Sequence, residues 1–171
     1  GEHLRNHVGN VHHDGADVWA HRELFDLDER GEPLAVSGVP PDYFSATGQR
    51  WGSPLYRWDR CREERWAWWI ERFRANLRIA DLVRIDHFRG FAGYWAIPAA
   101  EPTAVLGQWR PAPGRELFDA VRDAVGGLSL VAEDLGVITA DVVALRDALG
   151  FPGMRVLQFG FSADDSPACL S

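Results

Sequence analysis

The sequence predicts an α/β protein in which helices alternate with the strands of a parallel sheet. From about residue 62 onwards, stretches with helical periodicity alternate with short apolar runs, which is the pattern of repeated βα units. The composition, with 46% hydrophobic and 25% charged residues, is that of an ordinary globular protein. A doubly wound sheet fits the same pattern, although no GxGxxG or P-loop motif follows any expected strand.

The first third of the chain carries weaker signals. Residues 1–17 contain several histidines and only scattered apolar residues, so we expect a loop or an irregular edge, with 1–16 an atypical or disordered segment. Residues 38–58 are too rich in glycine and proline for a regular element and too aromatic for a solvated linker. We therefore expect an ordered functional loop there.

Three βα elements are expected after this loop. A helix is predicted from about Arg62 to Ile79 because its apolar residues recur at helical spacing, namely Trp66, Trp69, Ile70, Phe73 and Leu77. The apolar run 82–86 predicts a buried strand. A second helix over 115–125 begins after Pro113-Gly114 and ends at Gly126-Gly127, and a strand is predicted over 128–133.

The last predicted helix has clear end signals. Thr139 is its expected N-cap, Asp141 lies in its first turn and Gly150 follows its last residue. A third strand is predicted over 154–161.

Charge and cysteine usage exclude several classes of partner. The net charge of −7 and the pI of about 5.3 disfavour binding to nucleic acid or to an anionic membrane surface. Cys61 and Cys169 form neither a disulfide scaffold nor a CxxC site, so a reducing, cytoplasmic location is expected. No apolar run approaches the roughly 20 residues that span a bilayer. The oligomeric state is left open.

Two acidic residues end successive predicted strands. Asp86 closes the first and Glu133 the second, and in a βα barrel the catalytic groups lie at such strand ends. Arg84 shares a strand face with Asp86, so the two can pair, which favours an ionised nucleophile. Glu133 could keep a proton in apolar surroundings and act as a general acid. Alternatively, each acid caps the following helix or faces solvent, and the pair of Arg84 with Asp86 is a salt bridge that fixes the strand register. His87 could bind a sugar hydroxyl, bind a metal or simply pack.

These residues carry a resemblance to a known family. Arg84-Ile-Asp-His-Phe-Arg-Gly-Phe91, followed by Tyr94-Trp95, resembles the nucleophile segment of amylomaltases, the 4-α-glucanotransferases also called disproportionating enzymes. Three other segments agree in the same order: 38–58 is similar to the loop over the active site, 132–136 to the acid/base segment and 152–159 to the following strand.

The resemblance implies a retaining double displacement on α-1,4-glucans and maltooligosaccharides, with Asp86 as nucleophile and Glu133 as acid/base. Arg84 would position Asp86, and the implied substrate-binding residues are His87, Asp42, Tyr43, Phe44, Gln49 and Trp51. It implies no cofactor and no metal. The implied fold is a partial (β/α)8 barrel, its middle strands and their loops, with 1–171 belonging to a single barrel domain.

Two departures from the family pattern are expected. The segment before Asp17-Val18-Trp19 lacks the apolar strand that the family places there, and a third catalytic carboxylate, in a His-Asp motif, is absent from the sequence. We therefore expect the 171-residue chain to be inactive by itself.

Two other functions fit parts of the sequence. A metal-dependent hydrolase would use Asp86, His87 and the His12-His13 pair, but adjacent residues on an extended segment point to opposite faces. A glucan-binding module would use the aromatic residues and would make both acids dispensable.

Overall fold

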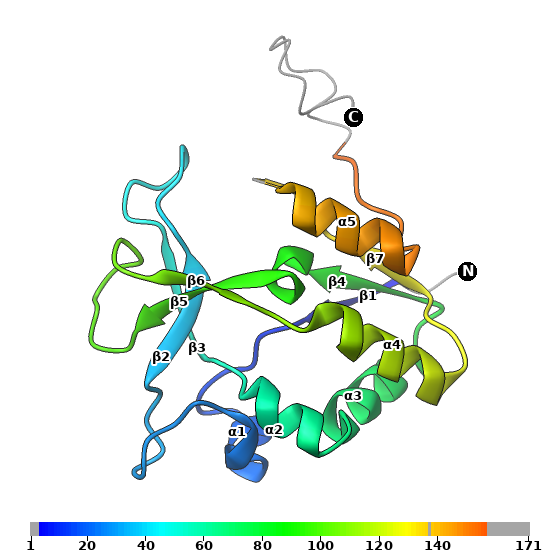
Figure 1. Cartoon of the computed structure of the whole chain (residues 1–171), viewed down its shortest axis with the longest axis horizontal. Coiled ribbons are helices and arrows are strands. Elements are labelled where there is room, and N and C mark those ends of the chain that lie inside the picture. The colour runs from blue at the N-terminus through cyan, green and yellow to red at the C-terminus, as the bar shows by residue number, and fades with distance from the viewer. Residues whose placement is uncertain (1–3, 137, 157–171) are drawn as a thin grey trace, which may run out of the picture.

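The structure, a computed structural model, describes residues 4–136 and 138–156. Figure 1 shows an antiparallel sheet on the left, with parallel strands and helices on the right. In chain order the elements are β1 (Leu4–Val8), α1 (Ala16–Ala20), η1 (Arg22–Leu24), β2 (Ala35–Val39), β3 (Gln49–Pro54), α2 (Trp58–Glu63), α3 (Ala67–Leu77), β4 (Leu82–Asp86), η2 (Phe88–Phe91), β5 (Gly93–Pro98), β6 (Gln108–Pro111), α4 (Gly114–Val125), β7 (Leu130–Ala132) and α5 (Ala140–Leu149). In the part described, no helix is both long and apolar enough to cross a membrane.

The parallel sheet has the order β1-β4-β7, with β4 in the centre. Helix α4 packs between α3 and α5, and the main core lies between these helices and the sheet. The side chains that fill it include Phe73, Leu117, Phe118 and Val121 from the helices and Val83, Ile85, Leu130 and Ala132 from the strands. Because strand side chains alternate between faces, Arg84 and Asp86 point away from this core. The predicted parallel pairing of the strands around 82–86 and 128–133 is confirmed.

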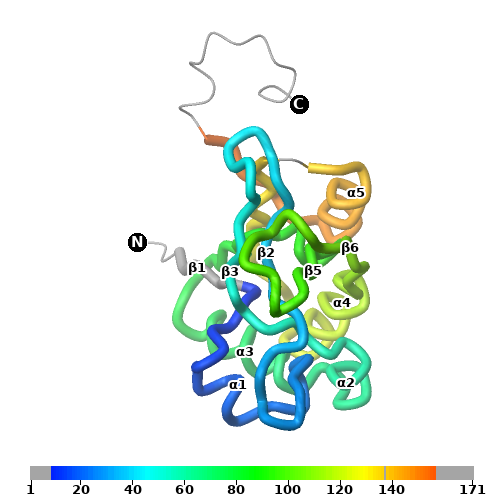
Figure 2. The backbone as a smooth tube through the Cα atoms, turned by 90° about the vertical axis from the view of Figure 1, so that its left-hand side faces the viewer, coloured from blue at the N-terminus to red at the C-terminus, as the bar shows by residue number. Residues whose placement is uncertain are grey.

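A second sheet, with the order β3-β2-β5-β6, is antiparallel and was not predicted. Its strands come from two segments that interrupt the βα pattern, residues 35–54 and 93–111, and the pairing of β2 with β5 joins them. Seen from the side, its strands lie toward the viewer with α4 and α5 beside them (Figure 2). The expectation of a loop over 38–58 is therefore wrong for β3, although the turn between β2 and β3 is irregular.

Gly38 explains part of this error. A Cβ atom at Gly38 would lie 2.2 Å from the carbonyl oxygen of Gln49 and 2.6 Å from Cδ1 of Ile97. The glycine that indicated a loop instead allows two strands to approach closely.

The helix predicted over Arg62–Ile79 is interrupted. Helix α2 ends at Glu63 and α3 begins at Ala67, because Arg65 and Trp66 adopt left-handed backbone conformations with φ values of 52° and 61°. The apolar stripe is confirmed nonetheless, with Trp66, Trp69 and Phe73 buried in the main core.

The N-terminal segment also differs from the expectation. Leu4–Val8 forms β1, which pairs in parallel with β4, so the loop expected over 1–17 is wrong here and a strand does precede Asp17. In the motif Asp17-Val18-Trp19, Asp17 accepts a hydrogen bond from Arg72 at 3.0 Å, Val18 is buried and Trp19 is exposed.

The C-terminal half follows the predictions more closely. Helices α4 and α5 lie where expected, and Gly126 and Gly150 end them in left-handed conformations. Strand β7 is shorter than the predicted 128–133. No strand includes residues 154–156, and the rest of the strand predicted over 154–161 lies outside the described residues.

Candidate functional site

Asp86 and Glu133 occupy equivalent places on neighbouring parallel strands. Ile85 pairs with Ala132, and the next residue on each strand is one of the two acids. The ladder continues past them, since Glu133 N–H donates to Ile85 O at 2.9 Å and Phe88 N–H donates to Glu133 O at 3.1 Å. Neighbouring strands lie about 4.8 Å apart, so both side chains leave the same sheet edge on the same face.

Both acids line one cavity of about 480 Å³. The parallel sheet supplies one wall and the antiparallel sheet another, with aromatic residues of the α2–α3 region contributing to the lining. The lining residues are Gly9, Asn10, Ser37, Gly38, Trp51, Ser53, Pro54, Leu55, Tyr56, Trp58, Trp69, Arg84, Asp86, His87, Gly90, Phe91, Tyr94 and Glu133. This volume and the largely apolar lining with few polar groups are typical of small-molecule sites.

Arg84 holds Asp86 from the same strand face, as predicted. Nη1 of Arg84 lies 2.5 Å from Oδ1 of Asp86, and Nε of Arg84 donates to Sδ of Met154 at 3.1 Å. The side chain of Asp86 remains 38% exposed, against 18% for Arg84. The carboxylate is thus both paired and accessible from the cavity, which a salt bridge serving only strand register would not require.

His87 connects the two acids through its backbone. Its conformation is left-handed, with φ 50° and ψ 53°, and its N–H donates to Oε2 of Glu133 at 2.8 Å. The ring packs at right angles to Trp51, with centroids 4.8 Å apart. Burial, together with the charge of Arg89, lowers the pKa of His87 to about 4. At neutral pH the ring is therefore an uncharged hydrogen-bonding group.

The carboxylate of Glu133 is held by two backbone N–H groups. Its two oxygens accept backbone hydrogen bonds, Oε2 from His87 and Oε1 from Leu135 at 3.1 Å. These two donors fix the direction of the carboxylate at the end of β7.

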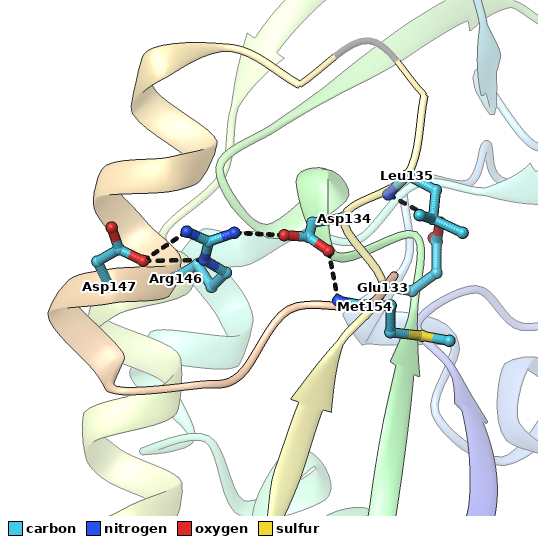
Figure 3. A network of polar contacts seen from close by, with 6 residues as sticks. All are labelled: Glu133, Asp134, Leu135, Arg146, Asp147 and Met154. Carbon is cyan, nitrogen blue, oxygen red and sulfur yellow. Dashed lines mark hydrogen bonds and ion pairs between the residues drawn. The ribbon is translucent and has the colours of Figure 1, made fainter. Parts of the chain in front are cut away.

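Asp134, the next residue, points away from the cavity and anchors this strand end (Figure 3). Its side chain is only 7% exposed, its Oδ1 accepts from Met154 N–H at 2.8 Å, and its Oδ2 pairs with Nη1 of Arg146 at 2.5 Å. Arg146 also pairs with Asp147 at 2.8 Å. Sequence reasoning missed Asp134, although an acid next to Glu133 must face the opposite side of an extended segment, toward the helix that carries Arg146.

The predicted loop residues fall into two groups. Trp51 lines the cavity, and Gln49 holds it by accepting a hydrogen bond from its indole N–H at 3.1 Å. Tyr43 and Phe44 are 97% and 89% exposed at the β2–β3 turn and pack edge to face at 5.6 Å. Asp42 shapes this turn through hydrogen bonds accepted from Phe44 N–H and Ser45 N–H.

Of the predicted site residues, the cavity therefore unites Arg84, Asp86, His87, Trp51 and Glu133. Asp42, Tyr43, Phe44 and Gln49 lie outside its lining. Within residues 4–136 and 138–156, no group of three or more His, Cys, Asp or Glu side chains has the arrangement of a metal site.

Comparisons with known proteins show which family the chain is similar to. The 4-alpha-glucanotransferase family profile matches residues 9–170. The 4-alpha-glucanotransferase of Synechocystis is 59% identical over 156 residues, covering 90% of this chain and 31% of the relative. That of Thermus thermophilus is 59% identical over 151 residues, covering 88% and 30%. This chain thus spans about a third of the length of these curated relatives.

Two solved structures share its fold. The amylomaltase from Streptococcus agalactiae in complex with acarbose matches with a TM-score of 0.90 and 42% identity, covering 95% of this chain and 33% of that one. The amylomaltase from Corynebacterium glutamicum matches with a TM-score of 0.80 over 96% of this chain and 22% of that one, at 23% identity. From the family match over nearly its whole length, the chain belongs to the 4-alpha-glucanotransferase family.

Proposed function

We propose that this chain supplies the nucleophile and the acid/base of a 4-α-glucanotransferase that acts on α-1,4-glucans and maltooligosaccharides. The observation that carries the proposal is the placement of Asp86, paired with Arg84, beside Glu133 in one cavity at the ends of adjacent parallel strands. The neighbour solved with acarbose, an amylomaltase, supports an oligosaccharide ligand.

We also propose that the fold is part of a (β/α)8 barrel. Supporting this are the parallel strands β1, β4 and β7, the helices α3, α4 and α5, and the position of both acids at the carboxyl ends of strands. In such barrels the catalytic groups lie at that end. A cytoplasmic location is proposed on the cysteine usage, with Cys61 buried and free.

The first half-reaction uses Asp86 as nucleophile. Its free carboxylate oxygen forms a bond to the anomeric carbon while the bond from that carbon to the leaving oxygen breaks, and Glu133 gives its proton to that oxygen. The close spacing of neighbouring strands suits a retaining mechanism, in which the two carboxyl groups lie about 5–5.5 Å apart. The ion pair with Arg84 holds the Asp86 carboxylate in place at the cavity.

In the second half-reaction Glu133 takes the proton of an acceptor hydroxyl, whose oxygen bonds to the anomeric carbon and releases Asp86. Each carboxyl oxygen of Glu133 has two lone pairs, so the oxygen that carries the proton can direct it toward the substrate while both backbone hydrogen bonds remain. Trp51 and the apolar lining restrict access by water, which favours transfer over hydrolysis.

The test is made in the protein at its full natural length, incubated with maltotriose. We expect glucose and longer oligomers from the unmodified protein, and a loss of about 10³-fold or more in Asp86→Asn and in Glu133→Gln. The matched control is Asp123→Asn, because Asp123 is an exposed acid on the outer helix α4. This variant should transfer glucan at the unmodified rate. The affinity for maltotriose, measured by calorimetry, should differ little between the variants and the unmodified protein. Turnover retained in either site variant would contradict the assigned roles, and binding without turnover in the unmodified protein would indicate a glucan-binding module.

A further inference from the structure

The antiparallel wall of the cavity contains a β-bulge. Val36 pairs with Pro54 and Gly38 with Arg50, so the single residue Ser37 on β2 stands opposite the three residues Trp51, Gly52 and Ser53 on β3. Gly52 has a φ of 78°, which a glycine adopts without strain. Bulges of this kind redirect side chains and are frequent beside active sites.

Alternation along β2 places the Ser37 side chain on the cavity face. Ala35, two residues earlier, packs with Leu55, Ala96 and Tyr94, whereas Val36 packs on the other face with Ile97 and Ala104. Ser37 is also the strand partner of Ala96. Leu55 and Tyr94 line the cavity together with Ser37, so Ser37 belongs to the wall of the cavity that also contains Asp86 and Glu133.

The Ser37 hydroxyl is buried and has no hydrogen-bond partner in the described part of the chain. The residue is 5% exposed, and among the described residues no atom forms a hydrogen bond with its Oγ. A buried hydroxyl without a hydrogen bond costs stability, and alanine would occupy this position without that cost. A ligand that reaches the hydroxyl from the cavity would supply its missing hydrogen bond.

We propose that Ser37 Oγ binds a hydroxyl group of the glucan held in this cavity. The proposal rests on the proposed function, because it takes the ligand to be a neutral sugar. A hydroxyl both donates and accepts, as sugar hydroxyls do, and the wall around it also contains Trp51, Ser53, Leu55 and Tyr94. A small number of polar groups in a largely apolar site fix the orientation of a ligand. Ser37 is thus a binding residue for the sugar that contacts the bulge.

The first experiment compares Ser37→Ala with the unmodified protein at its full natural length, using maltotriose. Loss of one hydrogen bond to the ligand should raise KM about 3- to 10-fold and leave kcat within about 2-fold. The thermal unfolding midpoint of the free protein should stay the same or rise, because the variant removes an unpaired hydroxyl. The matched control is Ser129→Ala. Ser129 is an exposed serine just before β7, at the end of the strand away from Glu133, so this variant should change none of these values.

The second experiment identifies the sugar group with monodeoxy analogues of maltotriose. In the unmodified protein, removal of one particular hydroxyl should raise KM by a similar factor, and in Ser37→Ala the same analogue and maltotriose should behave alike. An unchanged KM in Ser37→Ala overturns the inference. A lower unfolding midpoint with unchanged KM also overturns it, since the hydroxyl would then have a structural partner such as a bound water.

These outcomes separate the two proposals. If the unmodified protein transfers glucan and Ser37→Ala has an unchanged KM, the inference about Ser37 fails and the proposed function stands. If the unmodified protein neither transfers nor binds maltotriose by calorimetry, both fail.

Discussion

The two walls of the cavity are held in place in different ways. On the parallel-sheet side, Asp86 pairs with Arg84, Glu133 accepts two backbone hydrogen bonds, and the adjacent Asp134 is buried in an ion pair. On the antiparallel side, Tyr43 and Phe44 stand almost fully exposed at the turn between β2 and β3. One region is fixed before a ligand arrives, and the other contacts solvent.

This difference matches the roles proposed for the two regions. Groups that take part in bond making need a fixed direction, because catalysis depends on preorganised charge and geometry. Aromatic residues that cover a flexible chain of sugars have to adapt to it. Substitutions behind the parallel wall should therefore reduce folding stability, whereas those at the turn should change substrate affinity alone.

The largest effect is expected at Asp134. In Asp134→Ala, Arg146 and Met154 N–H lose their buried partner, and the free energy of unfolding should fall by about 3 kcal/mol. Asp147→Ala is the matched control, because Asp147 pairs with the same arginine but is 60% exposed, and should cost at most about 1 kcal/mol. Urea unfolding of the 171-residue chain measures both. Equal losses would show that the strand end is not anchored through Asp134.

A smaller effect is expected from the pH dependence of His87. Burial lowers its pKa from 6.5 to about 4, so between these pH values the unfolded chain binds the extra proton. Above pH 6.5 His87 is uncharged in both states, and its full contribution to the free energy of unfolding is present. As the pH falls toward 4, this contribution is lost, by an amount on the order of 2 kcal/mol.

His87→Asn tests this, since asparagine tolerates the left-handed backbone. Urea unfolding at pH 7 and pH 4.5 should give a smaller difference for the variant than for the unmodified chain, with Asp123→Asn as a control that behaves like the latter. Identical differences in all three chains would mean that His87 is not buried as described.

The sheet edge that carries Asp86 and Glu133 was predictable from local patterns. Each acid follows an apolar run, and the two-residue period of a strand places Arg84 with Asp86 on one face and Val83 with Ile85 on the other. Parallel pairing then brings Glu133 to the same edge. These conclusions need only the spacing of residues within short segments.

Other features depend on contacts between distant segments, which local patterns do not record. The antiparallel sheet forms because β2 meets β5, about 60 residues later, and the main evidence in its own sequence, Gly38, is equally typical of a loop. The helix break at Arg65 and Trp66 was hidden because Trp66 stays on the apolar stripe of the interrupted helix. Strand β1 is defined by its pairing with β4 and has no apolar run of its own.

The smallest stability effect is expected at the β2–β3 turn, and it sharpens the comparison between the walls. Tyr43→Ala and Phe44→Ala should change the free energy of unfolding by less than about 0.5 kcal/mol, as is usual for exposed positions. If these rings contact the glucan, each substitution should still raise KM about 2- to 10-fold in the full-length protein, the range expected for a lost aromatic contact.

Trp51→Ala is the matched aromatic substitution on the same hairpin. It removes the contact with His87 and the hydrogen bond to Gln49, so it should lower both stability and affinity. If Tyr43→Ala destabilised the chain as much as Trp51→Ala, the turn would be as firmly held as the wall, and the adaptive role assigned to it would be wrong.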